Sequence, residues 1–167
     1  APFDDLDALD RALSKRDVAA FFVEPIQGKG ANMPSPDYLS RAAALCAKYG
    51  TLFVADEIQT GVGRTGKFLA VEHWGAEPDM VLLAKALSGG HVPVGAVLAR
   101  RKIFEKVFNR MDRAVVHGST FSKNDLAMAA GLATLEVLEG EQLIANAARR
   151  GEQILEGARG DARVDLT

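Results

Sequence analysis

Several features are scarce in this sequence, and each shortage excludes a class of protein. A single cysteine, Cys46, cannot form an internal disulfide, and its place in an apolar helical pattern indicates a core residue. His73, His91 and His117 are scattered without the spacing of metal ligands, so no metal site is predicted. The net charge of −2 gives no electrostatic reason to expect nucleic acid or an anionic membrane as a partner.

Long hydrophobic runs are also missing, since none approaches the ~20 residues that span a bilayer. The acidic, amphipathic beginning APFDDLDALDRAL does not resemble a secretory signal, so a cytoplasmic location is predicted by default. The length fits one domain over residues 1–167. The chain has no initiator methionine and begins partway into a helical pattern, so we expect a part of a longer protein, with N-terminal and C-terminal parts absent.

The order of apolar segments predicts an α/β fold. Strands are expected at 19–23, 51–55, 80–83 and 94–98, and helices at 6–13, 35–50, 103–108, 124–138 and 141–155. The long helix after the first strand is predicted to start with Ser35 as its cap and Pro36 in its first turn, and to end at Gly50. Because the strands are continuous apolar runs, we expect a mostly parallel sheet with helices on both faces.

Three charged residues stand at the ends of predicted strands: Glu24, Asp56 and Lys85. In an open α/β sheet, ligands bind just beyond the carboxyl ends of the strands, so Asp56 and Lys85 should share one edge. An ion pair that closes the sheet, or charges that simply point into water, would explain the same pattern.

Four segments occur in an order that is typical of one enzyme family. They are EPIQGKG at 24–30, VADEIQTGVGRTGKF at 54–68, PDMVLLAKALSGGHVPVGAV at 78–97 and HGSTF at 117–121. Together they resemble the class III (omega-type) aminotransferases that depend on pyridoxal 5'-phosphate (PLP) and have fold type I. The spacing from Asp56 to Lys85, 85 − 56 = 29 residues, matches that family. The chain resembles the central part of the large, cofactor-binding domain.

The resemblance implies transamination from an amine or amino acid to a 2-oxo acid through a Schiff base of Lys85. Lysine is the side chain that offers the amine for this bond. Asp56 is implied to keep the pyridine nitrogen of the cofactor protonated, so that the ring can accept electrons. The two residues are therefore the expected catalytic pair.

The resemblance also implies further cofactor contacts. Gln59 is expected to reach the ring hydroxyl oxygen, and Ile58 to pack on one face of the ring. Ser119 and Thr120 offer hydroxyls and backbone N–H groups to the phosphate, shortly before a predicted helix. In the family this loop reaches the phosphate of the neighbouring subunit, so a homodimer with shared active sites is expected.

One position departs from the family, and several family elements fall outside the sequence. Many members carry an acid where this chain has Lys29. The second phosphate loop, the aromatic residue that stacks on the ring and the arginine for the substrate carboxylate are expected upstream or downstream. We therefore expect residues 1–167 alone to be inactive, and a catalytically silent chain with half a PLP site is the first alternative.

A second alternative comes from the segment Gly61–Lys67, which almost fits the phosphate loop of nucleotide hydrolases. Phe68 stands where that motif needs a hydroxyl for Mg²⁺, and a single strand would have to supply both the acid and the phosphate loop. The remaining interpretations of this segment are an exposed turn or, by the resemblance, a lid near the active site.

Overall fold

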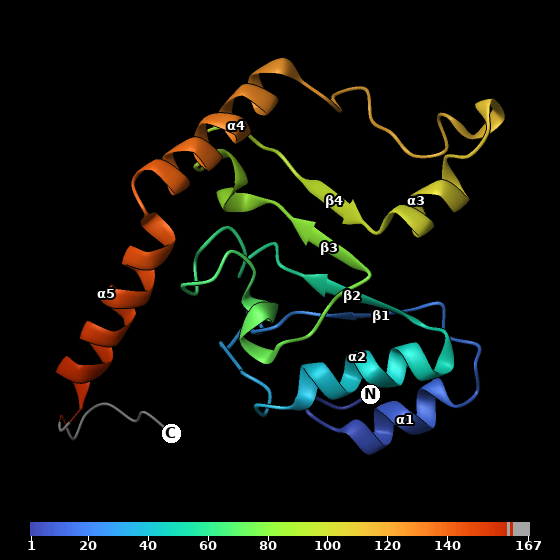
Figure 1. Cartoon of the computed structure of the whole chain (residues 1–167), viewed down its shortest axis with the longest axis horizontal. Helices are drawn as coiled ribbons and strands as arrows, with labels where there is room; N and C mark the ends of the chain where they lie inside the picture. Colours follow the sequence, from blue (N-terminus) through green and yellow to red (C-terminus); the bar gives the residue numbers. More distant parts are fainter. Residues whose placement is uncertain (160, 162–167) are drawn as a thin grey trace.

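A computed structural model describes residues 1–159 and 161 and contains a four-stranded sheet in the order β1-β2-β3-β4 (Figure 1). The strands are β1 (Ala20–Val23), β2 (Leu52–Asp56), β3 (Met80–Leu83) and β4 (Ala96–Ala99). The first three are parallel neighbours, and β4 runs antiparallel to β3. The α/β class and the mostly parallel sheet are thus confirmed. The antiparallel edge was not predicted, and it arises because residues 84–95 turn back beside β3 without an α-helical crossover.

Two helices, α1 (Leu6–Leu13) and α2 (Tyr38–Tyr49), pack against each other and against one face of the sheet. Their apolar sides bury Leu9, Leu13 and Leu39 together with Phe53 of β2. Gly50 ends α2 in a left-handed conformation, as predicted, with φ 78°. On the opposite face, the described residues leave Phe22 62% exposed and Val97 58% exposed, so the helices present here cover one side of the sheet more fully than the other.

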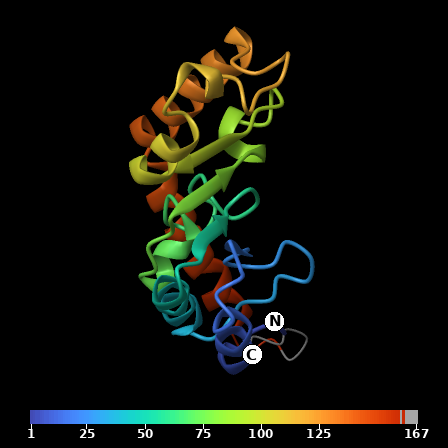
Figure 2. The same ribbon diagram turned by 90° about the vertical axis from the view of Figure 1, so that its right-hand side faces the viewer.

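Two longer helices, α4 (Asp125–Gly140) and α5 (Leu143–Ala158), come after the strands of the sheet in the sequence. The side chain of Asn124 caps α4 by accepting a hydrogen bond from Ala127 N. In Figure 2 the orange helix α4 lies on the side of the molecule opposite the loop that joins β1 to α2, and the red helix α5 runs from there towards the end of the molecule where the termini lie. No helix within residues 1–159 and 161 is long and apolar enough to cross a membrane.

Short helices occupy the remaining connections. The α-helix α3 (Arg101–Val107) follows β4, and 3-10 helices form at η1 (Ala70–Trp74), η2 (Lys85–Ser88) and η3 (Met111–Arg113). The sequence pattern predicted none of the 3-10 helices. The most consequential is η2, because it starts at the strand-end lysine and packs against α4.

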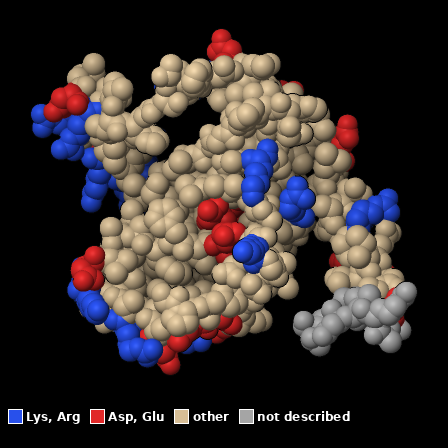
Figure 3. Space-filling model, turned by 180° about the vertical axis from the view of Figure 1, so that it is seen from behind, with Lys and Arg blue, Asp and Glu red and all other residues tan. Residues whose placement is uncertain are grey.

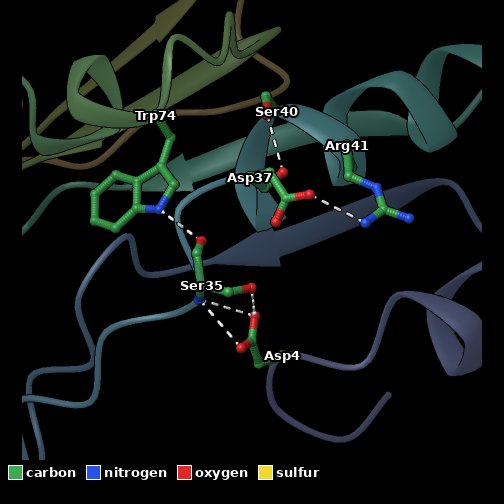
Figure 4. A network of polar contacts seen from close by, with 6 residues as sticks. All are labelled: Asp4, Ser35, Asp37, Ser40, Arg41 and Trp74. Atoms are coloured by element: carbon green, nitrogen blue, oxygen red, sulfur yellow. Dashed lines mark hydrogen bonds and ion pairs between the residues drawn. The ribbon is translucent and has the colours of Figure 1, made fainter.

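The predicted start of the helix after β1 is wrong by two residues, and the polar contacts of Ser35 explain why (Figure 4). The Ser35 N–H and hydroxyl donate to the Asp4 carboxylate, and the Ser35 carbonyl accepts a hydrogen bond from Trp74 Nε1 at 3.0 Å. These contacts hold Ser35 ahead of the helix, and Asp37 occupies the N-cap position of α2. Through Ser35, these hydrogen bonds connect the N-terminal segment that contains Asp4 to η1, which contains Trp74.

Candidate active site

Asp56 and Lys85 lie at the same edge of the sheet. Asp56 is the last residue of β2 and pairs in register with Leu82 of β3. Lys85 comes three residues after Leu82, directly beyond the end of β3. Since β2 and β3 are parallel neighbours, their carboxyl ends bring the acid and the amine to one rim, as predicted from the sequence. Figure 3 shows acidic and basic side chains gathered in the middle of a face that is otherwise largely uncharged.

The backbone of Lys85 has an uncommon conformation. Its φ is +46°, in the left-handed region that non-glycine residues adopt at a cost of about 1 kcal/mol or more. The turn into η2 imposes this conformation immediately after the strand ends. The side chain is exposed, and its Nζ donates to Gln59 Oε1 at 2.7 Å. The strained turn therefore presents a primary amine at the strand edge.

A chain of hydrogen bonds connects Lys85 to the loop after β1. The Gln59 amide that accepts from Lys85 also donates through Nε2 to the Gly28 carbonyl at 3.4 Å. Gly28 N in turn donates to Glu24 Oε2 at 2.7 Å. A Cβ at Gly28 would lie 3.1 Å from both Gln59 Oε1 and Glu24 Oε2. Glycine at this position thus lets the β1 loop approach Gln59 closely, and the strand-end acid Glu24 holds that loop.

Asp56 is half-buried, and its side chain organises the turn that follows β2. Its Oδ1 accepts a hydrogen bond from Ile58 N at 3.1 Å. Within residues 1–159 and 161, no ion pair or hydrogen bond joins Asp56 to Lys85. The alternative of an ion pair closing the sheet is therefore wrong for this lysine, because its amine faces the neutral amide of Gln59.

Glu57 is the residue of this region whose role the sequence pattern missed. Its side chain is 0% exposed, and its carboxylate accepts from Thr60 Oγ1 at 2.5 Å and from Val71 N at 2.7 Å. The first bond closes the turn that carries Ile58 and Gln59, and the second ties that turn to η1. Asp56 and Glu57 are adjacent in sequence but have different partners, Ile58 N for Asp56 and Thr60 with Val71 for Glu57. The signal available in the sequence was a second acid directly after the strand-end acid.

The rim also contains an open pocket that includes Lys85. Its other lining residues come mainly from η2 and the segment that follows, with Arg64 contributed by the loop after β2: Ala86, Ser88, Gly89, Gly90, Val92, Pro93, Val94. Arg64 and Lys85 are the two charged residues in this lining. Sequence reasoning treated Arg64 only as part of an exposed turn or lid, because nothing in the linear pattern shows which way the turn folds.

The fold of this turn also removes the nucleotide-hydrolase alternative. A phosphate loop leads straight into an α-helix whose N-terminus faces the phosphate. Here the Gly61–Lys67 segment is followed by the short 3-10 helix η1. The segment packs instead on α5, where a Cβ at Gly66 would lie 2.8 Å from the Cβ of Ala148. The geometry that the motif requires is absent from this part of the chain.

Ser119 and Thr120 lie in the loop that precedes α4. Both are exposed, and no described hydrogen bond joins either of them to Lys85, Gln59 or Asp56. Ser119 contacts its own loop, where its Oγ accepts from Phe121 N at 3.3 Å. It lines a second, mostly apolar pocket formed with the start of α4. Within residues 1–159 and 161, these hydroxyls therefore make no hydrogen bond to the strand-end lysine.

The fold is that of known aminotransferases. The ornithine aminotransferase of Toxoplasma gondii superposes with a TM-score of 0.88 at 45% identity, over 95% of this chain and 36% of that one. The acetylornithine aminotransferase of Elizabethkingia anophelis gives a TM-score of 0.83 at 44% identity, over 92% and 38%. The expected fold type I is therefore confirmed. The T. gondii structure is described as having partial occupancy of PLP at its active site.

The sequence comparisons give the same answer. The profile of the family described as "Aminotransferase class-III" matches residues 3–161, and the chain belongs to this family. The ornithine aminotransferase of Plasmodium falciparum (isolate CDC / Honduras) is 47% identical over 156 residues, and that of Plasmodium yoelii yoelii is 48% identical. Each match covers 93% of this chain and 36% of the relative. The chain thus spans just over a third of the length of these relatives.

Proposed function

We propose that the protein carrying this chain is a PLP-dependent aminotransferase that moves an amino group from an amine or amino acid to a 2-oxo acid. The observation that carries the proposal is the exposed amine of Lys85, placed by a left-handed turn beside Gln59 and at the same rim as Asp56. Membership of the class-III aminotransferase family supports it.

The residues at the rim have the chemical groups that binding PLP requires. When bound, PLP supplies an aldehyde that bonds to an amine and a pyridine ring that takes up the electron pair of a substrate C–H bond. Lys85 Nζ is a primary amine without an acidic partner in the described residues, so the amine is accessible for attachment. Asp56 uses one carboxylate oxygen for Ile58 N, which leaves the other to accept from a ring N–H. Ile58, next to it, supplies an apolar surface for one face of the ring.

Lys85, Gln59 and Asp56 have separate roles in the proposed transamination. Lys85 Nζ holds the cofactor before the substrate arrives and afterwards moves a proton to and from the substrate Cα. Gln59 positions that amine through Oε1, and the Gly28 carbonyl keeps the Gln59 amide in the required orientation. Asp56 stabilises positive charge on the ring nitrogen. A carboxylate at this place contributes most when charge develops in the transition state.

The quaternary arrangement is part of the proposal. We assign Ser119 and Thr120 to the phosphate site of a neighbouring subunit in a homodimer. The finding that neither makes a described hydrogen bond to Lys85 or Gln59 supports this assignment. Residues 1–167 are taken as one unit of the cofactor-binding domain, in a cytoplasmic protein. The curated relatives are named ornithine aminotransferases, so ornithine is the first amino donor to test.

The test is an assay of the full-length protein with PLP, ornithine and other amines as donors, and pyruvate or 2-oxoglutarate as acceptors. We expect amino-group transfer that Lys85→Ala abolishes. Residues 1–167 expressed alone should show no transfer at the same PLP occupancy. If the full-length protein takes up PLP but transfers no amino group from any donor, the proposed function is wrong.

A further inference from the structure

Glu24 is the strand-end charge that the proposed transamination leaves without a role. It follows β1 directly, just as Asp56 ends β2 and Lys85 follows β3 closely. Glu24 is exposed, and no ion pair within residues 1–159 and 161 includes it, so a charge pair does not explain this carboxylate. Its contact is with its own loop, where Oε2 accepts a hydrogen bond from Gly28 N at 2.7 Å. This distance is typical of a hydrogen bond to a charged acceptor.

Gly28 links this carboxylate to the amide beside Lys85. The Gly28 carbonyl accepts a hydrogen bond from Gln59 Nε2 at 3.4 Å, and Gln59 Oε1 accepts one from Lys85 Nζ at 2.7 Å. A Cβ at Gly28 would lie 3.1 Å from both Glu24 Oε2 and Gln59 Oε1. Gly28 therefore lies between the two side chains without room for one of its own, so a displacement of Gly28 changes the surroundings of Gln59 directly.

The orientation of the Gln59 amide matters because its two ends differ chemically. The amide oxygen accepts hydrogen bonds, whereas the amide nitrogen donates them. The oxygen faces Lys85 Nζ, and the nitrogen faces the Gly28 carbonyl. A half-turn of the amide would place donors against the amine and the oxygen against the carbonyl, and both hydrogen bonds would be lost. The bond to Gly28 thus favours the orientation that serves Lys85.

The loop that contains Gly28 also has a second support. Gln27 N donates to the Asn32 carbonyl at 3.0 Å, and Asn32 Nδ2 donates to Gln27 Oε1 at 2.9 Å. These hydrogen bonds do not involve Glu24, so the loop should stay closed when Glu24 is replaced. The specific contribution of Glu24 is therefore the placement of Gly28 within a loop that is closed by other residues.

We propose that Glu24 is a positioning residue for the strand-end lysine and acts through Gly28 and Gln59. By anchoring Gly28, the carboxylate keeps the Gln59 oxygen directed at Lys85 Nζ, and so holds the amine at the rim before a cofactor is bound. Glu24 itself does not contact the amine. The inference rests on the proposed function in that transamination is the reaction that needs Lys85 Nζ in one place.

Chemical labelling of Lys85 tests this path in the full-length protein freed of PLP. Formaldehyde with cyanoborohydride methylates accessible amines, and peptide mass mapping gives the rate at Lys85. Glu24→Ala should raise that rate by about three- to tenfold, the effect of losing one hydrogen bond of ordinary strength. Glu24→Gln keeps an acceptor oxygen for Gly28 N and should restore most of the wild-type rate. The control Glu72→Ala should leave the rate unchanged, although Glu72 also accepts from a backbone N–H, that of Leu69 at 2.8 Å.

Two further variants decide whether the effect runs through Gln59. Gly28→Ala places a methyl group between the two side chains, so it should raise the labelling rate of Lys85 as Glu24→Ala does. Gln59→Ala should raise it as well, and adding Glu24→Ala to Gln59→Ala should cause no further change, because both act on one hydrogen bond. An unchanged rate in Glu24→Ala, or effects that multiply in the double variant, would overturn the proposal.

The labelling needs neither PLP nor amino transfer, so its outcome is separate from that of the proposed function. Faster labelling of Lys85 in Glu24→Ala supports the positioning role even in a protein that transfers no amino group. If transamination takes place, Glu24→Ala should also lower kcat and leave the KM for the 2-oxo acid near wild type. A raised KM with an unchanged kcat and unchanged labelling overturns the proposal and assigns Glu24 to substrate binding.

Discussion

Replacing Glu57 by alanine should destabilise the protein strongly, and the contacts of this buried carboxylate give the magnitude. Glu57 is 0% exposed and accepts from the Thr60 hydroxyl and from Val71 N. Glu57→Ala leaves two buried donors without a partner, each costing about 1–3 kcal/mol, and opens a cavity. Relief from burying a charge offsets part of the loss. We expect a decrease in unfolding free energy of about 3–5 kcal/mol.

Two further variants make this prediction specific. Glu57→Gln keeps the side-chain volume and one acceptor oxygen, so its loss should be smaller, about 1–3 kcal/mol. Glu136→Ala removes an exposed acid of α4 and should change stability by less than about 0.5 kcal/mol. Urea unfolding followed by circular dichroism gives all three values. Hydrogen exchange should also quicken at residues 58–71 in Glu57→Ala. A loss below about 1 kcal/mol in Glu57→Ala would contradict the anchoring role.

Three further predictions concern other parts of the chain. Asp56→Asn should still bind PLP yet slow transamination by about 10³-fold, and near-normal turnover per folded molecule would rule out its role at the ring nitrogen. Asp79→Ala should lower the unfolding free energy by about 1–3 kcal/mol, because Asp79 accepts a hydrogen bond from Phe53 N and pairs with Arg100. The control Glu77→Ala should leave the unfolding free energy almost unchanged, because Glu77 pairs with Arg100 at an exposed position. Burial raises the pKa of the Cys46 thiol to about 11, with the nearby Asp79 charge adding to the effect. Alkylation of native protein at pH 8 should thus be slow. Above pH 9 this thiol should reduce stability, since the unfolded thiol ionises first.

The strands show how far an apolar pattern alone can predict a fold. The predicted strand at 80–83 coincides with β3, and those at 19–23, 51–55 and 94–98 are displaced by one or two residues. These segments are apolar runs in the sequence, and the two central strands, β2 and β3, are the ones that contain buried residues. The direction of β4 could not be predicted in this way, because strand polarity depends on the connection. Residues 84–95 form only a short 3-10 helix and return to the edge of β3.

Capping residues predicted the end of α2 correctly but not its start, where a tertiary contact uses the side chain of the predicted cap. Gly50 ends α2 as its sequence suggests, because a left-handed C-cap needs little besides glycine. Ser35 has the composition of a helix cap, yet its hydroxyl is taken by Asp4, 31 residues away. No local rule contains that contact, so the helix start was misplaced.

The candidate site, like the fold, was predictable from the sequence only in part. Asp56 and Lys85 were predictable because each ends an apolar strand, and parallel strands end at one edge. The contact between Lys85 and Gln59 depends on a positive φ at Lys85 and on the close approach of Gly28. The place of Arg64 in the Lys85 pocket depends on how the turn packs against α5. These are properties of the folded chain, and sequence spacing does not contain them.

The most direct test of the account is to identify the lysine that holds the cofactor. The full-length protein is incubated with PLP, reduced with borohydride, digested and mapped by mass spectrometry. Lys85→Ala and Lys67→Ala serve as the matched pair, since both lysines are exposed. The pyridoxyl group should be on the peptide that contains Lys85, should disappear in Lys85→Ala and should remain in Lys67→Ala. Its recovery on Lys67 or Lys123 in the wild-type protein would contradict the assignment of Lys85.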